Sequence, residues 1–190
     1  MAVENVVFLL EEKSAKEMLD VIVPKILPEG VSHKCIPFEG KSDLEKNIAR
    51  KIRLWLKPNS VFMVMRDQDS NDCVAVKEKL LRLCAESGKP SSDYLVRIAC
   101  HELESFYLGD LNAVRSAGYK VKLSKRFKNG YENPDVLANP SEELLKITDN
   151  EYRKVQGSSK IADYLGFDGS NKSTSFNMLV SGIKKLVAGM

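Results

Sequence analysis

Short apolar runs alternate with amphipathic segments over the first hundred residues, and this alternation most constrains the fold. Four runs have the length and composition of strands, at 3–10, 32–38, 61–65 and 94–99. Three segments with apolar residues at helical spacing lie between them, at 14–26, 42–55 and 74–85. Because a helix that joins two parallel strands forms a right-handed crossover, the pattern predicts an α/β protein with a parallel, Rossmann-like sheet in the order β-α-β-α-β-α-β.

Two of the expected helices have a recognisable start. Ser14-Ala-Lys-Glu17 and Ser42-Asp-Leu-Glu45 both match a capping box, in which a hydroxyl and a carboxylate satisfy free backbone N–H groups of the first turn. The sequence therefore predicts that these helices begin at the two serines.

The regular alternation stops near residue 109. Residues 118–140 are rich in Lys, Arg, Asn, Gly and Pro, which predicts a long connection with little regular structure. Asn139-Pro140 is typical of a helix start. Helical patterns then cover roughly 141–155, 159–166 and 174–188. We therefore expect an α/β domain at 1–117 and a basic loop plus helical C-terminal extension at 118–190, packed on the same core.

The composition is that of a soluble protein. Charged residues make up 29% of the 190 residues, and no apolar run reaches the roughly 18 to 20 residues needed to cross a bilayer. The first ten residues carry no basic segment, so they do not match a signal peptide. We therefore expect a cytoplasmic protein with no membrane partner. Its four cysteines lack zinc-finger spacing and are expected to be reduced thiols.

Acidic residues follow three of the four predicted strands. They are Glu11 and Glu12 after the first, Asp67, Asp69 and Asp72 after the third, and Glu102 and Glu104 after the fourth. Ligands of parallel α/β sheets bind beyond the carboxyl ends of the strands. Because neighbouring carboxylates resist ionising together, such a cluster favours a bound cation, and its oxygen ligands suit Mg²⁺ or Mn²⁺.

The spacing of these acids suggests separate roles. Glu11, Asp67 and Asp69 are the predicted ligands of a first ion, because residues two apart in an extended segment project to the same side. Glu102 and Glu104 would hold a second ion or orient water. The alternative is a set of exposed loop acids without a site, since acids at helix N-termini suit the helix dipole.

Gly40-Lys41-Ser42 resembles the end of a phosphate-binding P-loop. That motif needs a glycine five residues before Gly40, where Cys35 stands, so we exclude a P-loop. The helix start at Ser42 can still bind a phosphate through its free N–H groups, and Lys41 could steady that phosphate during catalysis. The alternative is a simple turn and cap.

The roles of the two histidines, and the alternative of a receiver domain, are less clearly indicated by the sequence than the metal site. His33 lies in a predicted strand and is expected to be structural, whereas His101 is either a proton shuttle or a packing residue. A phosphoacceptor receiver domain also has acids after its first and third strands. A receiver domain has no Glu-x-Glu after the fourth strand, so the sequence favours the metal-site hypothesis over the receiver-domain hypothesis.

The net charge of +3 arises in the C-terminal part, where residues 111–190 hold 13 Lys and Arg against 8 Asp and Glu. Several cations there are candidates for phosphate contacts, which position a nucleic acid without reading its sequence. They are Arg153, Lys154, Lys160 and Lys172. The alternative is a solvated helical cap over the edge of the sheet.

The arrangement of acids resembles the Toprim domain of topoisomerases, bacterial primases and OLD (overcoming lysogenization defect) nucleases. That domain has a Glu after the first strand, an Asp-x-Asp after the third and often further acids after the fourth. Leu10-Glu11-Glu12-Lys13-Ser14 stands where the Toprim pattern has Glu-Gly-x-Ser/Thr. Glu11 therefore matches the Toprim acid, and Glu12 replaces the glycine.

More closely, the chain resembles a prokaryotic family of Toprim-like proteins with a domain of unknown function, related to the OLD nucleases. The similarity runs nearly end to end, through Phe-Leu-Leu-Glu-Glu-Lys-Ser, Glu39-Gly-Lys-Ser-Asp43, Asp67-Gln-Asp-Ser-Asn-Asp-Cys73, Arg97-Ile-Ala-Cys-His-Glu-Leu-Glu104 and Asn171-Lys-Ser-Thr-Ser-Phe176. Members often lie beside genes for ATPases in phage-defence clusters.

This resemblance implies a Mg²⁺-dependent nuclease or phosphotransferase that acts on nucleic acid in phage defence, with an ATPase as a further partner. No module with a nucleophilic tyrosine and no zinc part of a primase accompanies the acids, so hydrolysis is the simplest chemistry. The alternative is a non-catalytic Toprim-fold protein that binds an ATPase or nucleic acid. The replaced glycine at Glu12 and the small size both allow it.

Overall fold

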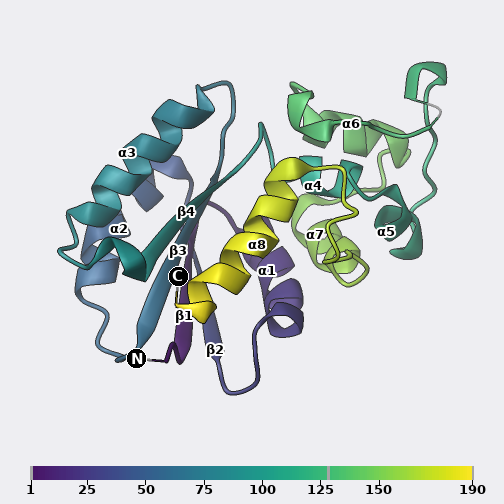
Figure 1. Ribbon diagram of the computed structural model, residues 1–190. Coiled ribbons are helices and arrows are strands. Elements are labelled where there is room, and N and C mark those ends of the chain that lie inside the picture. Colours follow the sequence, from purple (N-terminus) through teal and green to yellow (C-terminus); the bar gives the residue numbers. More distant parts are fainter. Residues whose placement is uncertain (1, 128, 190) are drawn as a thin grey trace.

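A four-stranded parallel sheet forms the centre of the protein, in the order β2-β1-β3-β4 (Figure 1). The computed structural model describes residues 2–127 and 129–189. The strands are β1 (Asn5–Leu10), β2 (Ser32–Pro37), β3 (Ser60–Asp67) and β4 (Tyr94–Ala99). The predicted α/β class and the parallel sheet are therefore confirmed, and all four strands lie where the apolar runs predict them.

The register brings the carboxyl ends of the strands together at one edge of the sheet. Leu10, the last residue of β1, pairs with Pro37 of β2 and Met65 of β3. Asp67 at the end of β3 pairs with Ala99 of β4. The chain segments that follow β1, β3 and β4 therefore leave the sheet at the same edge, which is where ligands of such folds bind.

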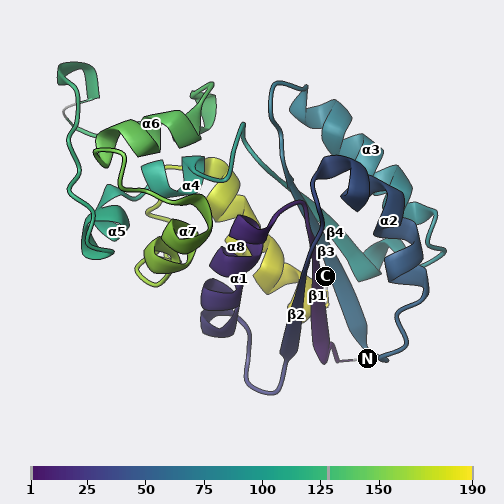
Figure 2. The same cartoon turned by 180° about the vertical axis from the view of Figure 1, so that it is seen from behind.

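Helices cover both faces of the sheet, as the buried runs of a parallel sheet require (Figures 1 and 2). The helices α2 (Lys41–Arg53) and α3 (Cys73–Ala85) cover one face, and α1 (Lys13–Ile26) and α8 (Thr174–Ala188) cover the other. Alternate residues of β1 enter the two cores. Val6, Phe8 and Leu10 face α1 and α8, whereas Val7 and Leu9 face α2 and α3.

Both predicted capping boxes are wrong. Helix α1 begins at Lys13, so Ser14 lies inside the first turn, and its hydroxyl donates to the carboxylate of Glu12. Helix α2 begins at Lys41 behind Gly40, whose φ of 93° is a left-handed conformation that favours glycine. The N-cap residues are Glu12 and Gly40, two positions before the serines, and neither makes a side-chain cap.

Shorter helices follow β4 and pack beside the sheet, at the right of Figure 1. They are α4 (Ser105–Leu108), α5 (Leu111–Ser116), α6 (Pro140–Ile147) and α7 (Lys154–Ala162), with 3₁₀ turns at Lys125–Phe127 and Pro134–Val136. Helix α6 begins at Pro140 as predicted, but it ends before 155 because Asp149 and Asn150 have φ of 56° and 61°. The sequence pattern did not predict α4 or α5.

No helix in the described residues is long and apolar enough to span a bilayer. The longest apolar helix, α8, instead packs on β4.

The carboxylate of Asp135 fastens the long connection to the start of α8. It accepts hydrogen bonds from the Ser175 N–H at 2.7 Å, from the Ser173 hydroxyl at 2.7 Å and from the Ser175 hydroxyl at 3.1 Å. The Ser173 hydroxyl also accepts from the Phe176 N–H and so caps α8. One acid therefore satisfies the first turn of the helix that covers β4.

Replacing Asp135 with alanine should lower the free energy of unfolding by about 2–3 kcal/mol, because it leaves the Ser175 N–H without its charged partner. Urea denaturation followed by circular dichroism measures this change. The control is Asp163→Ala, which removes only an exposed ion pair with Lys25 and should cost less than about 1 kcal/mol. Equal losses in the two variants would contradict this role of Asp135.

Candidate metal centre

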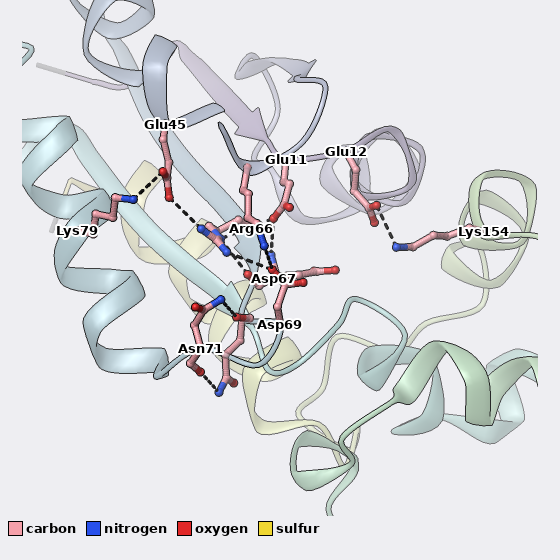
Figure 3. A network of polar contacts seen from close by, with 11 residues as sticks. Glu11, Glu12, Glu45, Arg66, Asp67, Asp69, Asn71, Lys79 and Lys154 are labelled. Atoms are coloured by element: carbon pink, nitrogen blue, oxygen red, sulfur yellow. Dashed lines mark hydrogen bonds and ion pairs between the residues drawn. The ribbon is translucent and has the colours of Figure 1, made fainter. Parts of the chain in front are cut away.

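Carboxylates from three strand ends lie near one another at the carboxyl edge of the sheet, and Figure 3 shows those that follow β1 and β3. Glu11 and Glu12 directly follow β1, Asp67 ends β3, and Glu104 follows β4 at the start of α4. Lys154, the first residue of α7, completes the group from the C-terminal part of the chain.

Asp67 is the centre of this group and is buried, with 8% of its surface exposed. Burial raises the pKa of its carboxyl well above the ordinary value, and Glu12, Glu104 and Glu11 raise that pKa further, against a smaller opposing effect of Lys154. Within residues 2–127 and 129–189, no donor makes a hydrogen bond to this carboxylate. The Asp67 carboxylate therefore has no protein partner among these residues, and its oxygens are not fully buried, so they keep some contact with solvent.

Glu11 connects Asp67 to Asp69. Its carboxylate accepts a hydrogen bond from the Asp67 N–H at 3.2 Å and lies 3.6 Å from the guanidinium of Arg66. Burial raises the pKa of Glu11, Arg66 opposes that shift, and the charge of Asp69 adds to it. Glu11 is thus electrostatically coupled to both aspartates of the Asp-x-Asp pair.

Asp69 does not extend the strand, contrary to the expectation that it projects beside Asp67. Strand β3 ends at Asp67, and Asp69 has a φ of 55°, with its N–H bonded to the carbonyl of His101 at 2.8 Å. Its carboxylate instead pairs with Lys41 at 3.0 Å and with Arg66 at 3.3 Å. The two-residue spacing argument therefore fails at Asp69, because the backbone there is no longer extended.

Arg66 neutralises the acids on the side of α2 and α3. Its guanidinium pairs with Glu45 at 3.0 Å, in addition to Glu11 and Asp69, and Glu45 also binds Lys79 at 2.7 Å (Figure 3). Only 4% of the Arg66 side chain is exposed. The negative charges of Glu11, Glu45 and Asp69 are therefore already paired with protein cations.

Glu12 and Glu104 form the other half, beside Lys154. The carboxylate of Glu12 pairs with Lys154 at 3.0 Å. Glu104 is fully buried and accepts a hydrogen bond from the Tyr152 hydroxyl at 2.9 Å, but its second oxygen has no partner in the part of the chain that the structure describes. Burial raises the pKa of Glu104, which Lys154 and Tyr152 partly oppose.

Lys154 remains protonated in this setting. Burial alone would lower its pKa, but Glu104, Glu12 and Asp67 together raise it above the ordinary value. Three acids therefore share one cation on this side of the site, which leaves an excess of negative charge.

The sequence argument named Glu12 among the strand-end acids but did not include it among the metal ligands. Glu12 stands where the Toprim pattern has glycine, yet it is the neighbour whose charge most raises the pKa of Asp67. The signal was present in the sequence, because Glu12 directly follows the strand that ends beside β3.

Two other predicted acids serve as helix caps. Glu102 accepts hydrogen bonds from the N–H of Ser141 at 2.8 Å and from its hydroxyl at 3.0 Å, and so caps the start of α6. Asp72 accepts from the Ala75 N–H at 2.8 Å and caps α3. The carboxylate of Glu102 is thus used by α6, so the structure does not bring it to Asp67 as the sequence argument expected.

The predicted basic residues of the C-terminal part have different surroundings. Arg153 donates to the carbonyls of Asn150 and Tyr152, which fixes it on its own turn. Lys160 and Lys172 line two different hollows. Among these four residues, Lys154 is the one whose ion pair, with Glu12, connects it to the acids around Asp67.

Lys41 and Ser42 line a hollow of about 380 Å³ at the start of α2, together with Arg66 and Lys79. Three cations and the acids Glu45 and Asp72 line it, next to the free N–H groups of the first turn of α2. Free N–H groups at a helix start suit an anion, and Asp69 is the acid that pairs with Lys41 there.

Comparison with known proteins agrees with this fold. Residues 10–184 match the model of a family described as Domain of unknown function (DUF4276). The chain belongs to this family. No curated protein matches the sequence significantly.

Two solved structures resemble the DUF4276 chain. The C-terminal region of the Burkholderia pseudomallei OLD protein is 16% identical, with a TM-score of 0.50 over 98% of this chain and 100% of that one. The C-terminal region of the Xanthomonas campestris pv. campestris OLD protein is 13% identical, with a TM-score of 0.49 over 98% and 94%. At such identities the likeness to the first structure shows the fold alone, a Toprim-like α/β fold.

The residues of this DUF4276 protein fit a divalent cation. The candidate ligand atoms around Asp67 are all carboxylate oxygens. One oxygen of Glu104 is buried without a partner among the described residues, and neighbouring acids raise the pKa of Asp67 and of Glu104. Mg²⁺ prefers oxygen ligands, and a cation would remove the repulsion among the acids.

Replacing Asp67 with asparagine should stabilise the protein at pH 8 when divalent ions are absent. The pKa of Asp67 is raised in the folded state, so its stabilising contribution is present below the unfolded pKa near 3.8 and is lost as the pH rises toward the folded pKa. Removing the charge should then raise the free energy of unfolding at pH 8 by on the order of 1 kcal/mol.

Thermal unfolding with EDTA at pH 5 and pH 8 measures this effect. The exposed Asp163→Asn variant is the matched control and should show the pH dependence of the wild type. A less stable Asp67→Asn protein at pH 8 would contradict the electrostatic argument.

Proposed function

We propose that this protein is a Mg²⁺-dependent nuclease that hydrolyses phosphodiester bonds of nucleic acid. The observation that carries the proposal is the buried Asp67 carboxylate, which has three acids beside it and no hydrogen-bond donor among the described residues. A poorly paired buried carboxylate is costly for stability, and a carboxyl with a strongly raised pKa among other acids is a candidate ligand-binding group. Its place at the carboxyl ends of the strands of a Toprim-like sheet agrees with that use.

Mg²⁺ or Mn²⁺ would be held by Glu11, Asp67 and Asp69, and a second ion by Asp67, Glu12 and Glu104. When bound, such ions polarise a phosphate and lower the pKa of a water molecule, the chemistry that phosphodiester hydrolysis needs. Glu12 replaces Glu102 in this assignment, because Glu102 is used by the start of α6.

The ion pair between Lys41 and Asp69 links phosphate binding to the metal ligands. Lys41 is 53% exposed, so it can turn from Asp69 toward a phosphate in the hollow at the start of α2. When Lys41 turns away from Asp69, the Asp69 carboxylate would be free to bind the cation. The Ser42 hydroxyl and the first N–H groups of α2 would donate hydrogen bonds to the same phosphate.

Lys154 would stabilise charge on the other side of the phosphate. It stays protonated and lies beside Glu12, Glu104 and Asp67. An ammonium group there is suited to contact a phosphate oxygen, and it offers no means of reading bases. We therefore propose a substrate chosen by its backbone, with Arg153, Lys160 and Lys172 as secondary contacts at most.

The resemblance to the OLD proteins also supports a role in phage defence and an ATPase as the partner. The similar structure is the C-terminal region of a larger OLD protein. We propose that the Toprim-like domain of this family likewise acts together with an ATPase.

Cleavage of labelled DNA and RNA with Mg²⁺, Mn²⁺ or EDTA tests the proposal. We expect cleavage only with a divalent ion. The Asp67→Asn and Glu104→Gln variants should lose at least about 100-fold in rate, the scale lost with one key electrostatic group. The exposed Asp163→Asn variant should cleave as the wild type does. Undiminished cleavage by Asp67→Asn would sink the proposed site.

Phosphate binding at the start of α2 gives a second prediction. Replacing Lys41 with glutamine should weaken DNA binding alike for every sequence and reduce the salt dependence of the binding constant by about one counterion. Fluorescence anisotropy at several salt concentrations measures both. The control is Lys146→Gln on α6, an exposed lysine outside this hollow. The same slope for wild type and Lys41→Gln would show that Lys41 meets no phosphate.

A second candidate function is favoured by one observation. Asp69 already pairs with Lys41 and Arg66, and Glu11 lies beside Arg66, so protein cations occupy part of the predicted ligand set. A non-catalytic protein that binds an ATPase or nucleic acid could retain such pairs. A wild-type protein that binds nucleic acid, but whose melting temperature does not rise with millimolar Mg²⁺ and which cleaves nothing, would establish this alternative.

A further inference from the structure

A second group of metal-ligating side chains lies away from the carboxylates, between α1 and the edge strand β2. Asp20 is on α1, and His33 and Cys35 are on β2. One ligand atom from each of the three lies within 4.8 Å of the others. The imidazole nitrogen of His33 is 3.7 Å from a carboxylate oxygen of Asp20, and the Cys35 thiol hydrogen-bonds to Asp20.

The strand geometry explains why these side chains converge. His33 and Cys35 are two apart in an extended strand, so both point to the α1 face of the sheet. Lys34 between them points to the other face, over the ring of Trp55. Because β2 is at the edge of the sheet, the group is only half-buried and an ion can reach it.

We propose that Asp20, His33 and Cys35 bind one Zn²⁺ ion, with the fourth position of the ion left to water. Bond lengths of about 2.0–2.3 Å place the ligand atoms of a tetrahedral zinc site about 3.5 Å apart. The His33–Asp20 distance already matches that separation. The remaining adjustment is a small side-chain movement on an exposed edge.

The donor set selects the metal. A thiolate and an imidazole suit Zn²⁺ and disfavour Mg²⁺, which takes oxygen ligands, so the site is chemically distinct from the acids around Asp67. Burial and the Asp20 charge raise the pKa of the Cys35 thiol, so the thiol keeps its proton until a metal displaces it. Binding therefore forms an S–Zn bond and releases that proton to solvent.

The second oxygen of Asp20 is held by Lys16 at 2.5 Å, one helical turn earlier. This pair fixes the carboxylate, so that its other oxygen faces His33. An outer partner of this kind orients a metal ligand. Zinc would thus fasten α1 to the outermost strand, which has a sheet neighbour on one side only.

Co²⁺ titration of the purified, reduced full chain tests the proposal, because a cysteine thiolate bound to Co²⁺ gives a charge-transfer band in the near ultraviolet. We expect this band in the wild type, its loss on addition of Zn²⁺, and its absence in Cys35→Ser. His33→Gln should weaken Co²⁺ binding by at least about 100-fold, more than the loss of an outer partner usually costs.

The Cys35→Ser variant should fold, because serine can still donate a hydrogen bond to Asp20; circular dichroism checks this. If it does not, Asp20→Asn supplies the same comparison through the Co²⁺ affinity. Two controls should keep the band: Cys73→Ser, which changes a half-buried cysteine on α3, and Asp67→Asn, which alters only the carboxylate site. A wild type without the band, or a band that disappears with Cys73 and not with Cys35, would overturn the proposal.

Discussion

The buried carboxylate of Asp67 is the constraint on which the functional edge of this protein depends. A charge with no hydrogen-bond donor costs stability, and three neighbouring acids increase that cost. The two apolar cores on either side of the sheet supply the compensating stability. They also fix the register of β1 and β3, so the acids that follow these strands cannot move apart without shifting fully buried residues. Rigid packing thus holds groups together that repel one another.

The polar network around Asp67 is divided into two unequal halves. On one side Arg66 meets three acids within one closely packed group, with Lys41 and Lys79 at its rim. On the other side Lys154 alone faces the remaining acids, and one oxygen of Glu104 is left over within the described chain. The deficit of positive charge lies on this second side. In the proposed site, the second cation would lie on the side near α7, and a phosphate would lie on the side near α2, where Lys41, Arg66 and Lys79 collect.

The sequence predicted the strands and most of the acids because both depend on local pattern. Apolar runs of strand length fix the parallel sheet, and a parallel sheet fixes which edge the following residues reach. It did not predict how each acid is used, because this depends on backbone turns and distant partners. Asp69 leaves the extended conformation two residues after the end of β3, and Glu102 meets Ser141 from a segment 39 residues away. The capping boxes failed for a similar reason, since each helix has its N-cap residue two positions earlier than the motif requires.

The C-terminal part of the chain is a component of the site and not only a basic surface. Tyr152 donates to Glu104, and Lys154 pairs with Glu12, so both ends of this short segment are tied to the acids. Gly157, one turn into α7, lies against the Tyr152 ring so closely that a Cβ there would collide with it. A larger residue at 157 would push Tyr152 away from Glu104 and leave a second carboxylate oxygen without a partner. The glycine at 157 therefore permits the close approach that keeps Tyr152 on Glu104, which the excess of positive charge in the sequence does not reveal.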